Sequence, residues 1–290
     1  MLAHLINGIS LGSIYAIIAL GYTMVYGIAK MLNFAHGDVI MVGGYISFYA
    51  MTLLGLPVPV AVLAAVFVCT VLGIVVERLA YKPLRAATSL AVLITAIGMS
   101  YFLQNAALLV WGANPKAYPN IFKDIEAVEY AGIRISPVAI VAIMANVVIM
   151  IALNLFTTRT KMGKAMRAVS EDKGAATLMG INVNFTISLT FAIGSGLAAI
   201  AGVLLCTAYP TLMPTTGSMP GIKAFTAAVF GGIGSIPGAM IGGLLLGIIE
   251  IFARAYISSE LADAIVFGVL IVVLLFKPTG LLGKQIHEKV

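Results

Sequence analysis

Few side chains in this sequence could take part in covalent or metal chemistry, and they are scattered. The histidines are His4, His36 and His287, and the cysteines, Cys69 and Cys206, each lie inside an apolar run. A catalytic or metal site needs several such groups close together, and no HExxH or paired-Asp motif occurs. The G-x-x-x-x-G-K-[ST] loop that binds phosphates is also missing from the sequence. We therefore expect no enzymatic activity, no metal and no cofactor in this chain.

Glu250 is the one acidic residue well inside an apolar run, where an ionisable group is a functional candidate. A carrier driven by a proton or sodium gradient would need such a carboxylate. Arg254 follows one helical turn later and offers an ion pair instead. We interpret Glu250 as structural and keep an ion-gradient-coupled carrier as an alternative function.

The longest polar stretch, residues 159–183, is suited to docking rather than to catalysis. It holds five basic residues against two acidic ones and lies between two long apolar runs. Its acidic start, alanines and closing glycine predict a short helix from Glu171 to Gly180. Such a helix can transmit displacement between a soluble partner and the membrane, whereas the alternative is a solvated cytoplasmic loop. The candidate coupling residues are Arg167, Glu171, Asp172, Lys173, Gly174, Ala175, Ala176, Leu178 and Gly180.

A second polar group lies at the junction of the first two apolar runs. Its members are Asn33, Phe34, His36, Gly37 and Asp38. A break of this kind exposes backbone groups, which a membrane tolerates where they are buried in protein or line a permeation path. The alternative is a helix cap, in which an Asn or Asp side chain binds the first free amides of the second helix.

A third pattern is rich in glycine and lies near the C-terminal end of the chain. It contains Gly231, Gly232, Gly234, Pro237 and Gly238, and further glycines follow at 242, 243 and 247. Small residues allow helices to pack closely in membranes. We expect either tight helix packing or a second cytoplasmic loop that helps to seat an ATPase.

The composition identifies the elements that must position these residues. Hydrophobic residues make up 61% of the 290 residues and charged residues 10%, and the mean hydropathy is +1.08. Soluble domains have about 25% charged residues. The sequence therefore predicts an all-α, polytopic membrane protein. Its net charge of +6 is explained by basic loops, so we expect no nucleic-acid partner.

Apolar runs and loop charges predict the topology. We expect about eight full transmembrane helices plus one short or re-entrant segment at 223–230, all in a single permease domain spanning residues 1–290. Twelve of the 17 Lys and Arg residues lie in loops that this arrangement places on one side. Because basic loops stay in the cytoplasm, the N-terminus is expected outside and the C-terminus inside, with the coupling insert 159–183 in the cytoplasm.

Three stretches in this order resemble the permease subunit of the branched-chain amino acid importers of bacteria, which are ATP-binding-cassette (ABC) transporters: LNFAHGDVIMVGGY at 32–45, GKAMRAVSEDKGAATLMGINV at 163–183 and AVFGGIGSIPGAMIGGLLLGIIE at 228–250. The resemblance implies an inner-membrane protein that transports branched-chain or other neutral amino acids, while similar permeases serve amides and urea. It also implies a second, related permease, two cytoplasmic ATPases that bind ATP and Mg, and a periplasmic amino-acid-binding protein. Residues 162–183 would then contain the helix that docks into an ATPase.

Overall fold

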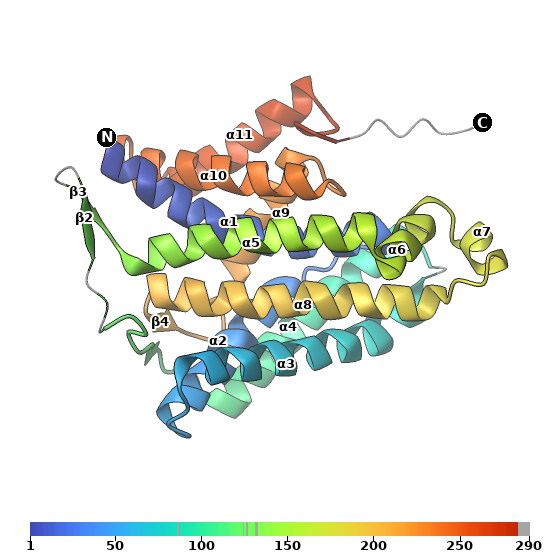
Figure 1. Ribbon diagram of the computed structural model, residues 1–290, viewed down its shortest axis with the longest axis horizontal. Coiled ribbons are helices and arrows are strands. Elements are labelled where there is room, and N and C mark those ends of the chain that lie inside the picture. Colours follow the sequence, from blue (N-terminus) through green and yellow to red (C-terminus); the bar gives the residue numbers. More distant parts are fainter. Residues whose placement is uncertain (86, 124, 126, 131–132, 284–290) are drawn as a thin grey trace.

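The structure is a computed structural model that describes residues 1–85, 87–123, 125, 127–130 and 133–283. Long helices lie side by side along a common direction (Figure 1). The short strands of the described part lie in loops, where β1 pairs with β4 and β2 with β3, both antiparallel. The chain is therefore an all-α protein, as its composition predicts.

The elements follow one another as helices with short connections. In η1 and η2, α3 continues as a π-helical turn and then a 3-10 turn. The bounds are α1 (Leu2–Ala29), α2 (His36–Thr52), α3 (Val58–Val76), η1 (Glu77–Tyr81), η2 (Lys82–Leu84), α4 (Ser89–Trp111), β1 (Lys116–Ala117), β2 (Val128–Tyr130), β3 (Ile133–Ile135), α5 (Pro137–Arg159), α6 (Lys161–Glu171), α7 (Lys173–Leu178), α8 (Val183–Ala208), β4 (Thr211–Leu212), α9 (Ser218–Gly231), α10 (Ile236–Tyr256) and α11 (Ala262–Phe276).

Six helices of the described chain are long and apolar enough to cross a membrane. They are α1, α3 with its extension to Leu84, α4, α5, α8 and α10. Three further helices are shorter: α2 has 17 residues, α9 has 14 and the apolar α11 has 15. The protein is thus polytopic, but helix length alone does not reproduce the eight full crossings expected from the sequence.

The start of α9 lies in a stretch whose prolines and glycines predict no helix. Residues 209–221 look too broken for a helix, yet α9 begins at Ser218 and includes Pro220 in its first turn. A proline is tolerated there because the first amides of a helix have no intrahelical partner. The residues before Ser218 do stay irregular, since Pro210 follows the end of α8 directly and cannot continue it.

Two helices form the centre of the bundle. In their most apolar stretches α1 is 89% buried and α8 is 83% buried, against 22% for each of α3, α4 and α5. Glycines bring α10 directly onto α1: a Cβ added to Gly12 would lie 2.7 Å from Leu244 Cα, and one added to Gly8 would lie 2.8 Å from Ile248 Cα. Gly243 and Gly247 face α1 from the other side of this contact. Small residues thus set the distance between these two backbones.

A buried charge cluster connects four helices. Lys223 of α9 places its Nζ 2.8 Å from Glu250 Oε1 of α10 and 2.6 Å from Asp263 Oδ1 of α11. Tyr15 of α1 donates a hydrogen bond to Glu250 Oε2 at 2.9 Å, and Arg254 pairs with the same carboxylate. The Glu250–Arg254 pair supports the structural interpretation of Glu250. Its second partner, Lys223, lies 27 residues away and could not be identified from the sequence. Two cations and two carboxylates balance; Lys223 and Glu250 are buried, whereas Asp263 and Arg254 are partly exposed.

We predict that Lys223→Met lowers the free energy of unfolding by about 3 kcal/mol, because it removes the buried cation that Glu250 and Asp263 share and leaves Glu250 with the partly exposed Arg254. The measurement is thermal or denaturant unfolding of the purified protein in detergent. Lys161→Met, at an exposed position of α6, is the matched control. The double variant Lys223→Met with Glu250→Gln should recover part of the loss. If Lys223→Met unfolds like the parent protein, the cluster does not stabilise the bundle.

Candidate functional site

The basic insert folds as two helices, α6 and α7, rather than as one. α6 ends at Glu171, and Asp172 is the N-cap of α7. The Asp172 Oδ1 accepts hydrogen bonds from Gly174 N at 2.7 Å and Ala175 N at 2.9 Å. The predicted start at Glu171 is therefore wrong by two residues, because the short aspartate side chain is the one that reaches the first amides. Gly180, with φ of 79°, follows α7 where a closing glycine was expected.

α6 is anchored to the bundle by one face. Gly163, Met166 and Val169 recur every three residues and are buried, whereas the basic residues between them are exposed. Thr160 caps the helix by accepting a hydrogen bond from Gly163 N at 3.0 Å. Arg167, one of the candidate coupling residues, donates to Thr158 O at 3.2 Å, so it holds the end of α5. The insert is therefore a positioned structure rather than a loose loop.

α7 presents a different face from the one expected. Ala176 is only 3% exposed and packs against the core, so it is not free to dock, contrary to expectation. Leu178 is 90% exposed and Met179 is 82% exposed, and Ala175 is also exposed. Because they are two residues apart on an α-helix, Ala176 and Leu178 point in nearly opposite directions. The exposed apolar side of the insert is thus formed by Leu178 and Met179.

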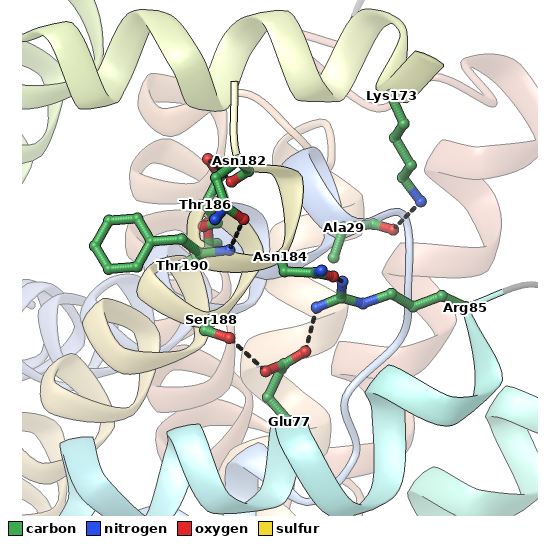
Figure 2. Close-up of polar contacts among 10 residues, drawn as sticks. Ala29, Glu77, Arg85, Lys173, Asn182, Asn184, Thr186, Ser188 and Thr190 are labelled. Carbon is green, nitrogen blue, oxygen red and sulfur yellow. Dashed lines mark hydrogen bonds and ion pairs between the residues drawn. The ribbon is translucent and has the colours of Figure 1, made fainter. Parts of the chain in front are cut away.

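Lys173 connects α7 to the end of the central helix. Its Nζ donates a hydrogen bond to Ala29 O at 3.3 Å, which lies at the C-terminal end of α1 (Figure 2). Burial, and then the positive charges of Arg85 and Lys30, lower the pKa of Lys173 from its ordinary value. The last carbonyls of a helix favour a cation, so this contact is stabilising in spite of the neighbouring charges.

A second polar cluster lies beside this contact and was missed by the sequence reasoning. Glu77, at the start of the π-helical turn η1, is fully buried; it pairs with Arg85 and accepts a hydrogen bond from Ser188 Oγ at 2.6 Å (Figure 2). Arg85 also donates to Asn184 on α8. In the sequence, Glu77 and Arg85 belong to a short stretch with three basic residues, which indicates only a cytoplasmic loop. An acid that directly ends an apolar run was the available signal, and π-turns often mark functional sites.

The junction between α1 and α2 is not the helix cap that was considered as the alternative. α1 ends at Ala29, and its C-cap Lys30 has the left-handed conformation (φ 57°); α2 begins after Ala35 with no side-chain cap among the described residues. Asn33 instead accepts a hydrogen bond from Tyr81 OH at 2.9 Å, and Asp38 Oδ1 accepts one from Gln104 Nε2 at 2.9 Å. These polar groups therefore face other helices rather than the first turn of α2.

The aromatic and imidazole members of the junction pack inward. His36 is 1% exposed, and its ring centre lies 4.6 Å from that of Tyr22 on α1. It lies directly over Gly21, where an added Cβ would come within 2.6 Å of the imidazole. Phe34 packs on Phe225 of α9 at 5.5 Å between ring centres. The junction is thus fixed against both α1 and α9.

The N-terminal ends of α2 and α9 meet inside the bundle. A Cβ on Gly37 would lie 2.7 Å from Gly217 O, and one on Gly221 would lie 2.8 Å from Gly37 Cα. Gln104 of α4 joins the two ends, because its Nε2 also donates to Ser218 Oγ at 3.2 Å. A cavity of about 250 Å³ opens beside this contact and is lined by residues of α1, α2, α4 and α9 and by Phe34.

The glycine-rich turn lies at the same end of the bundle as the insert, away from this cavity. Gly231 and Gly238 contact each other where α9 ends and α10 begins, and Ser235 caps α10 by accepting from Gly238 N at 3.3 Å. Gly232 and Gly234 have φ of 108° and 92°, which glycine adopts readily. Pro237 occupies the first turn of α10. Close packing therefore explains Gly231 and Gly238, while the role of the turn in seating an ATPase stays a prediction.

Comparison with known proteins identifies the family. A family model described as branched-chain amino acid transport system, permease component, matches residues 4–274. The chain is 48% identical over 300 residues to the high-affinity branched-chain amino acid transport system permease protein BraD of Pseudomonas aeruginosa, covering 100% of this chain and 98% of that protein. It is 47% identical to the corresponding permease protein LivH of Escherichia coli, covering 100% and 97%.

A solved structure agrees with the fold. PsaBC from Streptococcus pneumoniae, in complex with Fab, superimposes with a TM-score of 0.50 at 14% sequence identity, covering 94% of this chain and 91% of that chain. At this identity the likeness concerns the fold alone. The family match over nearly the whole length confirms the resemblance found in the three sequence stretches. The chain belongs to the family of permease components of branched-chain amino acid transport systems.

Proposed function

We propose that this chain is the inner-membrane permease of an ATP-driven importer, which moves branched-chain or other neutral amino acids into the cytoplasm. The family and its relatives support the substrate class. The observation that carries the ATP-driven mechanism is the capped helix pair α6–α7, which presents an exposed apolar side and is tied to α1 through Lys173. Its role is transport rather than catalysis. ATP and Mg would be bound by separate ATPase subunits.

The orientation that fits this role places the N-terminus outside and the C-terminus in the cytoplasm. The insert and the last turn of α1 share one end of the bundle, and the N-terminus and the strands lie at the opposite end (Figure 1). The residues after α11 return to the insert end, because Leu281 N donates to Phe230 O at 2.9 Å. With α2 and α9 each completed by an extended segment, and with α11 crossing as well, the chain would cross the membrane nine times.

Three kinds of partner complete the importer. Two cytoplasmic ATPases would each receive one coupling helix, and a periplasmic amino-acid-binding protein would dock at the outer end. A second, related permease would cover the cavity, because polar groups at membrane depth must face protein or water rather than lipid. Tyr101, on the rim of the cavity, is 63% exposed and marks this open side. The junction from Asn33 to Asp38 would then line the translocation path between the two permeases.

We expect Leu178→Asp and Ala175→Arg to weaken ATPase attachment by roughly 30-fold or more, because burying an unpaired charge costs at least about 2 kcal/mol. Copurified ATPase, hydrolysis stimulated by the loaded binding protein, and uptake into vesicles are the measurements. Lys161→Asp is the control: it adds a carboxylate to the exposed first turn of α6, where an acid suits the helix. Unchanged values for both test variants would show that α7 does not couple the ATPase.

The topology predicts opposite accessibility for two lysines. Lys164→Cys should react with a membrane-impermeant thiol reagent only from the cytoplasm, and Lys123→Cys only from outside. The native cysteines, Cys69 and Cys206, are buried and give a low background. Lys277→Cys serves as a third position and should behave like Lys164→Cys. Reaction of the cysteines at 123 and 164 from the same side would contradict the arrangement.

A further inference from the structure

The cavity beside the starts of α2 and α9 is lined by Asp38, and one of its two carboxylate oxygens lacks a hydrogen-bond partner in the described part of the chain. Asp38 is 1% exposed; its Oδ1 accepts the hydrogen bond from Gln104, but its Oδ2 has no hydrogen-bond partner among the described residues. None of the ion pairs in the described part of the chain includes Asp38. Asp38 also lines the cavity. An acid at membrane depth without a cation is a functional candidate, because such a group is costly to keep.

Hydroxyl groups surround the same carboxylate. Gln104 Nε2 lies 2.9 Å from Asp38 Oδ1 and 3.2 Å from each of Ser100 Oγ and Ser218 Oγ, so its two hydrogens are shared among three acceptors. All three oxygens are therefore gathered around one amide nitrogen on the wall of the cavity. Carboxylate and hydroxyl oxygens accept hydrogen bonds, and an ammonium group offers three donors in a compact arrangement. This part of the cavity is suited to a primary ammonium group.

The starts of α2 and α9 favour a negatively charged ligand group. α2 begins after Ala35 and α9 after Gly217, and neither has a side-chain cap in the described part of the structure. The positive end of a helix dipole lies at each start, and in transporters such half-helix starts face anionic groups of the substrate. The cavity thus offers a negative side at Asp38 and a positive side at the start of α9. A zwitterion complements both.

The remaining walls are apolar and the volume is small. Phe34, Ile97 and Ile222 line the cavity together with the rings of Tyr22 and Tyr101. A cavity of about 150 Å³ can hold benzene. The 250 Å³ found here therefore leaves room for an amino acid with an aliphatic side chain.

We propose that this cavity binds the transported amino acid in transit. The Asp38 carboxylate, with the Ser100 and Ser218 hydroxyls, accepts hydrogen bonds from the substrate ammonium group, while the start of α9 faces its carboxylate and the apolar walls contact its side chain. This assignment rests on the proposed transport function and adds to it a substrate site within the membrane. Gln104 is a positioning residue, since it holds the three oxygens together.

Binding is tested without transport in the complete complex, purified without its binding protein. Ile97→Cys places a thiol on the apolar wall of the cavity and leaves the proposed polar ligands intact, and its alkylation rate is measured with millimolar L-leucine, 4-methylpentanoate or isopentylamine. We expect L-leucine to slow alkylation several-fold, and the analogues, which lack the ammonium or the carboxylate group, to have little effect. Equal protection by all three, or none by leucine, would overturn the site. Protection by Na⁺ alone would show a metal-cation site and would overturn it as well.

Transport is tested with the complex in proteoliposomes that contain the loaded binding protein. Asp38→Asn and Gln104→Ala should each lower L-leucine uptake per ATP hydrolysed by roughly tenfold, the value of one charged hydrogen bond. Asn105→Ala is the matched control, because this neighbouring amide is exposed and, among the described residues, donates its hydrogen bond to Tyr101 O within its own helix. Parental uptake per ATP in both test variants would overturn the site. If the parent complex shows no ATP-dependent uptake at all, the proposed transport function fails instead.

Discussion

The structure depends on how backbone polar groups are satisfied where helices break inside an apolar bundle. A membrane offers no water to free amides and carbonyls, so irregular backbone persists only where protein covers it. Two such breaks precede α2 and α9, and each covers the other: Gly37 lies against Gly217 and Gly221 with no room for a side chain. Gln104 then joins the two helix starts by hydrogen bonds to Asp38 and Ser218. The cavity exists because these two breaks coincide.

Helix starts inside a bundle must be held firmly, and the rest of the fold supplies this. α1, the central helix, receives the His36 ring against Gly21 on one side and α10 against Gly12 on another. Lys223 on α9 is fixed by Glu250 and Asp263, so the short helix is tied to α10 and α11. The balanced charges make its position specific, and we regard this as the reason for placing charge in an apolar region.

The same central helix connects the cavity to the insert. α1 carries Tyr22 at the cavity and ends at Ala29, where Lys173 of α7 binds its carbonyl. Next to this contact, Glu77 joins the end of α3 to α8 through Arg85 and Ser188. A displacement of α7 would therefore reach α1 directly and α8 through the chain that follows α7. In the proposed importer, these contacts are the physical route from the ATPase to the transport path.

The sequence by itself determined that this is a membrane protein, and it also determined the position of the basic insert, the closing glycine at 180 and the family. Hydropathy, charge and local motifs depend only on residues that are close together in the sequence. It misplaced the start of α7 and could not show that Ala176 is buried while Leu178 is exposed, since the direction of a helix face depends on what packs against it. The pairs Lys223 with Glu250 and Asp38 with Gln104 join residues 27 and 66 positions apart. Only the tertiary structure decided them, because no local pattern records which distant helices become neighbours.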